Sequence, residues 1–330
     1  MSKFNKRVAI YFGYEGNNNN PNGDPANENK PRQYNGKEVL TTDVSSKRDD
    51  RDYLISLNEN AIFLKQQYNK DGTTMQMDDL LVDKLKDKGF VKGDNIKKAN
   101  YLLNRFIDLK YFGAAFTGSS DKPDSLKESV TGPVQKSFGI SLNYPNLLPA
   151  KITTILATKA GNVGTGSMGT KYILDYYYIH HDIIVNPKSL DTWGVDFTDE
   201  DFNVFERVQW CAIKDDITHS KLDREPIVMI EIFFKDDDFY FLPMKYVKSK
   251  KQKDVTRLED MGLDFTELVK KANDEESNIE KIRYKTNSKI SDLFKTDFLD
   301  KIKCQSKEEI NFISSDEVTK VLESYEKYKK

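Results

Sequence analysis

The sequence has few of the residues that build metal sites, disulfides or membrane spans. It contains two cysteines, Cys211 and Cys304, which lie far apart and form no CxxC or Cys/His spacing that could hold zinc. No stretch approaches the roughly 20 apolar residues of a membrane-spanning helix, and residues 1–7 are too polar for a signal peptide. We therefore expect a cytoplasmic protein with no metal, no cofactor and no membrane partner.

An excess of positive charge is also missing. The chain has 51 Lys and Arg residues against 53 Asp and Glu residues, a formal net charge of -2. A protein that coats nucleic acid through its overall charge needs surplus cations, so any nucleic-acid site must be a local basic patch. Of three histidines, His180 and His181 are adjacent on a predicted strand and point to opposite faces, which excludes a joint metal site.

The chain does contain an ordered series of strand and helix patterns. Strand patterns occupy residues 7–14, 151–158, 172–185 and 227–234, the last turning into a strand at 239–242, while Thr42 and Thr198 cap helices. Without residues 60–150, this order is β-α-β-β-α-β, the ferredoxin-like order found in RNA-recognition motifs. The fold class that we predict is therefore α+β.

Several short motifs follow one another between residue 8 and about residue 240. They are Asn20-Pro21-Asn22-Gly23-Asp24-Pro25, Pro31-Arg32, Thr42-Asp43-Val44, Lys47-Arg48, Arg51-Asp52-Tyr53-Leu54, Phe112-Gly113-Ala114, the segment from Gly132 to Gly139, and Thr218-His219-Ser220-Lys221. Together they resemble the seventh CRISPR-associated (Cas) family, the backbone of type I Cascade complexes. The type I-B branch is the most similar, with type I-C as its neighbour.

The resemblance implies a palm with a modified RNA-recognition motif, formed by residues 1–59 and 151–245, with a thumb hairpin at about 159–172. Residues 60–150 would be a helical insertion, and residues 246–330 a charged, mostly helical C-terminal region. Several copies would line up along one CRISPR RNA, in contact with each other and with other Cascade subunits. The guide would pair with target DNA while a separate helicase-nuclease cuts, so this subunit would perform no chemistry.

The expected RNA-binding residues come from four segments. They are Asn20, Asn22, Gly23 and Arg32 after the first strand, Lys47, Arg48 and Arg51 on the first helix, Gln135, Lys136 and Ser137, and the thumb residues Lys159, Gly164, Gly166, Ser167, Met168 and Lys171. Glycine lets the backbone approach a sugar-phosphate chain, cations meet phosphates, and an apolar tip can wedge between bases.

Each segment has a plainer alternative. Residues 16–29 could be an ordinary Asn-rich surface loop, which we expect to lack regular structure. Lys47 and Arg51 share a helix face, but three aspartates interleave with the basic residues, as on a solvated helix. The thumb could be a disordered linker hairpin. The lysine-rich run at 245–253 could contact RNA or displaced target DNA, or be a solvated linker.

Two further alternatives concern function. Backbone proteins of type III complexes resemble this family and cleave bound RNA with an acidic residue; here Asp24 is the candidate, although an aspartate in a turn is more often structural. The chain could also bind protein partners without contacting RNA. Tyr176, Tyr177 and Tyr178 are left out of the site, because aromatic residues on strands are more often core than stacking platforms.

Overall fold

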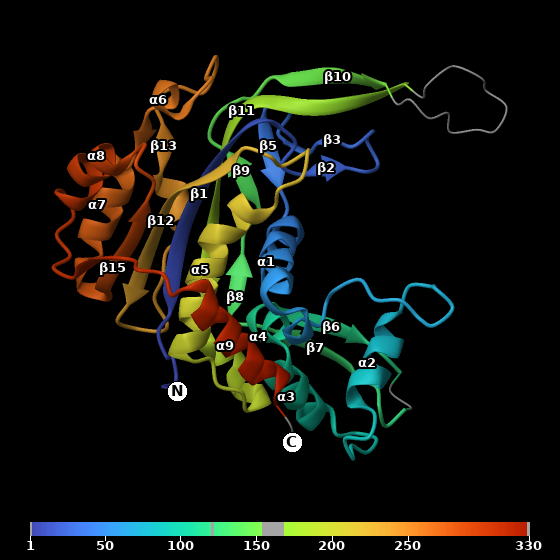
Figure 1. Cartoon of the computed structure of the whole chain (residues 1–330). Coiled ribbons are helices and arrows are strands. Elements are labelled where there is room, and N and C mark those ends of the chain that lie inside the picture. The colour runs from blue at the N-terminus through green and yellow to red at the C-terminus, as the bar shows by residue number, and fades with distance from the viewer. Residues whose placement is uncertain (1, 120–121, 154–167, 329–330) are drawn as a thin grey trace.

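The computed structural model describes residues 2–119, 122–153 and 168–328. These residues form an α+β structure in which one large, mostly antiparallel sheet is covered by helices and loops (Figure 1). Within these ranges, no helix combines the length and the hydrophobicity that crossing a membrane requires.

The large sheet is built around the first strand. β1 (Val8–Asn19) pairs antiparallel with both β11 (Met168–Val185) and β12 (Arg224–Phe234). The strand order is β16-β15-β12-β1-β11-β9-β5-β4, and β8 and β10 also pair with β11. The other strands of this sheet are β4 (Gln33–Tyr34), β5 (Glu38–Thr41), β8 (Val134–Lys136), β9 (Gly139–Ser141), β10 (Leu147–Thr153), β15 (Ile279–Thr286) and β16 (Lys307–Glu309).

Both faces of β1 are buried. Val8, Ile10 and Phe12 belong to the hydrophobic cluster on one face of the sheet. Ala9 and Tyr11 belong to a second cluster on the opposite face. Successive side chains of a strand point to opposite sides, so this division confirms the predicted first strand.

Helices cover the face that carries Val8 and Phe12 (Figure 1). They are α1 (Asp43–Asn58), α5 (Asp199–Asp215) and α9 (Ser315–Glu326). The predicted caps are confirmed: the hydroxyls of Thr42 and Thr198 accept hydrogen bonds from the backbone N–H groups of Ser45 and Asp201.

Residues 239–278 and 287–304, which flank the sheet strand β15 in the sequence, cover the opposite face. They form the hairpin of β13 (Lys248–Ser249) with β14 (Leu263–Asp264), and the helices α6 (Leu258–Met261), α7 (Thr266–Asp274) and α8 (Ser291–Phe294). Tyr176 and Tyr178 are buried beneath this layer, and Tyr177 is buried on the helix side. The predicted core role of the three tyrosines is thus confirmed.

The insertion contains strands as well as the expected helices. It comprises α2 (Met77–Leu85), α3 (Asn95–Arg105), α4 (Ile107–Phe112), β6 (Gly113–Thr117) and β7 (Lys127–Thr131), followed by β8, β9 and most of β10. Gly113 has a φ of +71°, and a Cβ there would lie 2.0 Å from the carbonyl oxygen of Val130. Only glycine can make this turn from α4 into β6, which gives the Phe112-Gly113-Ala114 motif a structural reason.

Three expectations were wrong. The Asn-rich segment is partly regular, because β1 continues to Asn19 and β2 (Gly23–Asp24) pairs with β3 (Lys30–Pro31). Residues 239–242 form no strand. The C-terminal region is not mostly helical, since β15 pairs with β12 and buries Ile279 and Ile282. Short 3-10 or π-helical segments lie at Glu59–Ala61, Pro187–Trp193, Pro243–Tyr246 (η3), Glu276–Asn278 and Lys295–Leu299.

Candidate nucleic-acid interface

The segment after β1 is held in place by side-chain amides. The amide nitrogen of Asn20 donates to the carbonyl of Asn29 at 2.8 Å, and the backbone N–H of Asn20 donates to the carbonyl of Ser220 at 2.8 Å. Gly23 lies so close to Asn29 that a Cβ would come within 2.2 Å of its side-chain oxygen. The β2–β3 hairpin is therefore packed against the segment that precedes β12.

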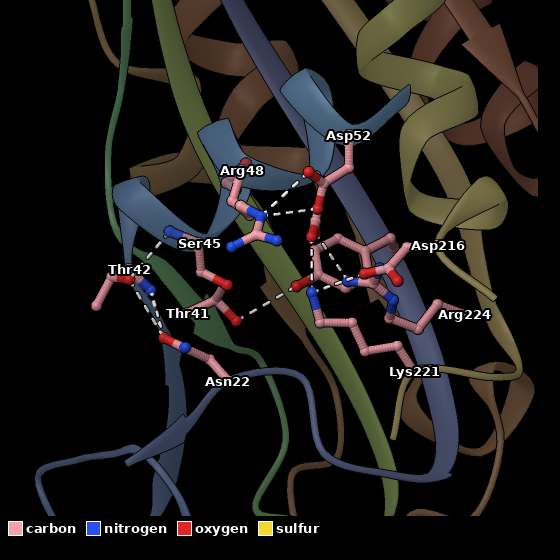
Figure 2. A network of polar contacts seen from close by, with 12 residues as sticks. Asn22, Thr41, Thr42, Ser45, Arg48, Asp52, Asp216, Lys221 and Arg224 are labelled. Carbon is pink, nitrogen blue, oxygen red and sulfur yellow. Dashed lines mark hydrogen bonds and ion pairs between the residues drawn. The ribbon is translucent and has the colours of Figure 1, made fainter. Parts of the chain in front are cut away.

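Asn22 joins this hairpin to the start of α1. Its side-chain oxygen accepts hydrogen bonds from the backbone N–H and the hydroxyl of Thr42, at 3.1 and 3.3 Å (Figure 2). Thr42 in turn caps the helix by accepting from the N–H of Ser45 at 3.2 Å. The hairpin and the first turn of α1 therefore form one connected unit, which carries Arg48 on its surface.

Arg32 and Asp24 face each other across the hairpin. The guanidinium of Arg32 lies 3.2 Å from the carboxylate of Asp24, and both side chains are partly exposed. The same carboxylate accepts from the N–H of Ala26 at 3.2 Å. Asp24 thus has the contacts of a turn residue, while Arg32 remains accessible from solvent.

The three cations of α1 differ in their surroundings. Lys47 pairs with Asp43 at 3.1 Å, and Arg51 pairs with Asp108 at 3.2 Å; both side chains are mostly buried and contact the ring of Phe112. The predicted common face of Lys47 and Arg51 is confirmed, but it faces α4. Arg48 is different because its side chain is 73% exposed while it pairs with an exposed aspartate, Asp52, at 2.8 Å.

A buried ion cluster lies beneath Arg48, and no sequence pattern had indicated it. Asp49 contacts Lys221 at 2.7 Å and Arg224 at 2.9 Å, and Asp216 contacts the same two cations (Figure 2). Burial would raise the pKa of Asp49, but the charges of Arg224 and Lys221 outweigh burial and hold that pKa below its ordinary value. The one sequence signal for this cluster was Lys221, the last residue of the motif Thr218-His219-Ser220-Lys221.

Lys136 lies inside the protein. Its side chain is fully buried, 2.5 Å from the carboxylate of Asp50 and 3.1 Å from the hydroxyl of Ser46. Burial lowers the pKa of Lys136 and raises that of Asp50. This ammonium connects β8 to α1 and is not at the surface, so the structure does not present Lys136, one of the expected RNA-binding residues, to an RNA chain.

The neighbours of Lys136 are nearer the surface. Gln135 is exposed and donates from its amide to the carbonyl of Gly132 at 2.9 Å. The hydroxyl of Ser137 donates to the carbonyl of Phe138 and accepts from the N–H of Asp182 at 3.0 Å.

The base of the β10–β11 hairpin lies beside the β2–β3 hairpin. Lys171 is partly exposed, with its ammonium 3.1 Å from Nδ1 of His219. Tyr172 donates to the carboxylate of Glu28 at 2.9 Å, and the ammonium of Lys30 lies 4.7 Å from the tyrosine ring centroid. A cavity of about 60 Å³ separates these segments, which suits a few water molecules but not a base.

Four predicted thumb residues, Lys159, Gly164, Gly166 and Ser167, lie outside the described residues. Met168 begins β11 and pairs with Thr153, and only its backbone position is described. The structure therefore brings part of the predicted set together at one surface, near His219 and Lys221: Asn20, Asn22, Gly23, Arg32, Arg48 and Lys171. The predicted residues Lys47, Arg51 and Lys136 lie beneath the surface.

Metal ligation finds no support in the described ranges. No group of three or more His, Cys, Asp or Glu side chains is placed there to hold an ion. His180 and His181 contact different tyrosines of β1, Tyr11 and Tyr14. Burial lowers their pKa values to about 3 and about 4, so both are neutral at physiological pH.

The chain is similar to known proteins over most of its length. A curated relative from Haloferax volcanii, CRISPR-associated protein Cas7, is 26% identical over 290 residues, which cover 80% of this chain and 82% of the relative. Among solved structures, a chain of a CRISPR RNA-guided surveillance complex in a pre-nicking state aligns with a TM-score of 0.52 at 12% identity, covering 97% of this chain and 100% of that chain. At 12% identity, the match to the solved structure shows a similar fold.

The family assignment rests on a match to a family model. The family model described as CRISPR-associated protein Cas7 matches residues 6–268. This range includes β1, the β2–β3 hairpin, the insertion, the β10–β11 hairpin and β12. The chain therefore belongs to the Cas7 family.

Proposed function

We propose that this protein is a non-catalytic, CRISPR RNA-binding backbone subunit of a type I Cascade complex, of the I-B branch. The observation that carries the proposal is the meeting of three segments at one surface: the β2–β3 hairpin, the first turns of α1, and residues 218–221 beside the base of β11. The curated relative, itself a Cas7 protein, and the family match support it.

The physical argument is that this surface offers backbone contacts rather than a base-reading pocket. It presents Arg32, Arg48 and Lys171 as accessible cations. The sheet face that holds Tyr176 and Tyr178 is covered, so bases cannot stack on these rings. A surface that contacts phosphates and sugars binds RNA with little dependence on sequence.

We further propose that the core is an RNA-recognition-motif palm. The order β12-β1-β11-β9, with antiparallel neighbours throughout, is the order of a ferredoxin-like sheet and supports this interpretation. Copies of the chain would contact each other head to tail along the guide, a contact that generates open helical arrays. The guide would then pair with target DNA, and a separate helicase-nuclease would cut it.

The experiment compares RNA binding by Arg48→Ala, Lys171→Ala and the double variant across a salt series. Each lost phosphate contact should reduce the slope of log K against log salt by about 0.7 for single-stranded RNA. Lys320→Ala is the matched control, because Lys320 is an exposed lysine on α9. Unchanged RNA affinity and slope in the double variant would remove this surface from the RNA interface.

A further inference from the structure

Three ionisable side chains meet between the sheet and α5, outside the residues of the proposed RNA interface. Glu231 on β12 lies directly opposite Arg283 on the neighbouring strand β15, and Glu206 extends from α5 to the same guanidinium. One guanidinium nitrogen of Arg283 lies 2.6 Å from a carboxylate oxygen of Glu206 and 3.7 Å from one of Glu231. Two carboxyl groups therefore share this cation.

Both carboxyl groups are almost completely removed from water. The side chain of Glu231 is fully buried, and that of Glu206 is 3% exposed. Neither oxygen of Glu231 accepts a hydrogen bond from a residue that the structure describes. A buried carboxylate that accepts no hydrogen bond has lost its solvation without replacement, and a second carboxylate beside it makes ionisation less favourable still. The ligand that this pair lacks is therefore a proton.

The surrounding elements supply too little positive charge for both carboxylates. Besides Arg283, β15 contributes Lys281, but Lys281 also pairs with Glu308 of β16 at 3.5 Å. On the other side of Glu231, β1 contributes the apolar residue Ile10. Among the described residues, three carboxyl groups thus face two cations, and one negative charge stays unbalanced unless a proton neutralises it.

We propose that Glu206 and Glu231 bind one proton between them, and that this proton holds β15 against β12 and α5. Glu231 carries the proton, and its hydroxyl donates to the carboxylate of Glu206, which stays paired with Arg283. A hydrogen bond to a charged acceptor is strong in a buried site, and here it replaces a repulsion between two like charges. Loss of the proton restores that repulsion and weakens the attachment of β15.

The proton makes this attachment dependent on pH. Burial and the charge of Glu206 raise the pKa of Glu231 well above its ordinary value. When β15 opens, the carboxyl group meets water and its pKa returns to about 4.3. The contribution of the proton is therefore complete below about pH 4 and is lost as the pH rises through the raised pKa of the closed form. Between these two values, each pH unit increases the equilibrium constant for opening by up to about tenfold.

The test compares amide hydrogen exchange in β15 between the full-length protein and its Glu231→Gln variant, without RNA. The variant mimics the protonated acid, because its amide can donate to Glu206 and cannot ionise. The ratio of β15 exchange rates, parent over variant, should rise at least about tenfold between pH 5 and pH 8. Glu225→Gln is the matched control, because Glu225 lies on the same strand with its own cation, Lys289, at 2.8 Å. The parent-to-control ratio should not change over this range.

An infrared difference spectrum at pH 6 gives a readout that does not depend on stability. The spectrum of the parent minus that of Glu231→Gln should contain the carbonyl band of one protonated carboxyl group, while other buried acids such as Asp182 cancel because both proteins contain them. Absence of this band, or an exchange ratio that does not change with pH, would overturn the proposal. Glu231→Met is a second neutral variant. If neither variant folded, the position would require a charge, which also contradicts the proposal.

Discussion

The guanidinium of Arg224 lies 2.9 Å from the carboxylate of Asp49, and both side chains are almost completely buried. Asp49 is on α1 and Arg224 begins β12, so this ion pair connects the helix that carries Arg48 to the segment that carries His219. Lys221 and Asp216 complete the cluster. The position of the proposed RNA interface therefore depends on a largely buried charge cluster beneath it.

Arg224→Ala should destabilise the fold, because it leaves Asp49 buried with one cation fewer. Removing one partner of a buried ion pair costs about 3–5 kcal/mol, and we expect the lower end because Lys221 remains. Urea denaturation measures the change. Arg48→Ala serves as control and should cost less than about 1 kcal/mol, because its pair with Asp52 is exposed. Parent-like stability of Arg224→Ala would contradict this account of the cluster.

Lys136→Met should destabilise the protein by about 3–5 kcal/mol, because it leaves the carboxylate of Asp50 buried without its cation. The double variant with Asp50→Leu should recover most of that loss, since apolar residues often replace a buried ion pair at little cost. RNA affinity of the folded double variant should match that of the parent. A specific loss of RNA affinity would return Lys136 to the RNA interface.

Asp182 should make stability decrease with rising pH. Burial raises its pKa to about 7, and the hydrogen bond from Met244 and the charge of Lys245 offset only part of this effect. The folded carboxyl thus keeps its proton to higher pH than the unfolded one, so its contribution is present below about pH 4 and is lost as pH rises to about 7. For any group, a difference of one unit between its pKa in the folded and in the unfolded protein corresponds to about 1.4 kcal/mol of stability.

Asp182→Asn should remove this pH dependence and raise stability at pH 8, because the amide oxygen can still accept from Met244. Thermal midpoints of parent and variant between pH 4 and 8 measure the difference. The two curves should diverge as pH increases. Parallel curves would show that Asp182 titrates in the fold as it does in the unfolded chain.

Tyr325→Phe should loosen the C-terminal helix. The hydroxyl of Tyr325 on α9 donates to the buried carboxylate of Asp201 on α5 at 2.5 Å. Loss of a hydrogen bond to a buried charged group costs about 1–3 kcal/mol, although Lys110 still pairs with the same carboxylate at 3.2 Å. Chemical denaturation measures the cost. Tyr328→Phe, at a half-buried tyrosine in contact with Tyr101, is the control that should stay near the parent.

Local sequence patterns predicted the elements whose causes are local. The alternation in β1 and the hydroxyl caps at Thr42 and Thr198 depend on neighbouring residues, and they were predicted correctly. The pairing of β15 with β12 depends on residues about 50 positions apart, which no local pattern reveals. For the same reason the C-terminal region was expected to be mostly helical.

The candidate site was predicted only in part, because charge type does not reveal burial. Lys136 and Arg48 look equally suitable for phosphate in the sequence, yet one lies against Asp50 in the core and the other extends into solvent. The Asp49 cluster escaped notice because its members come from α1 and from residues 216–224. Spacing cannot bring together partners that only the tertiary fold makes neighbours.

The most direct test of the central claim is the size of complexes formed between the purified protein and single-stranded RNAs of increasing length and unrelated sequence. The account predicts salt-sensitive complexes whose mass grows with RNA length, regardless of base sequence, and RNA that is recovered intact. Cleavage that is lost in Asp24→Asn would assign the chain to the RNA-cleaving alternative. A folded protein that binds no RNA at low salt would contradict the account.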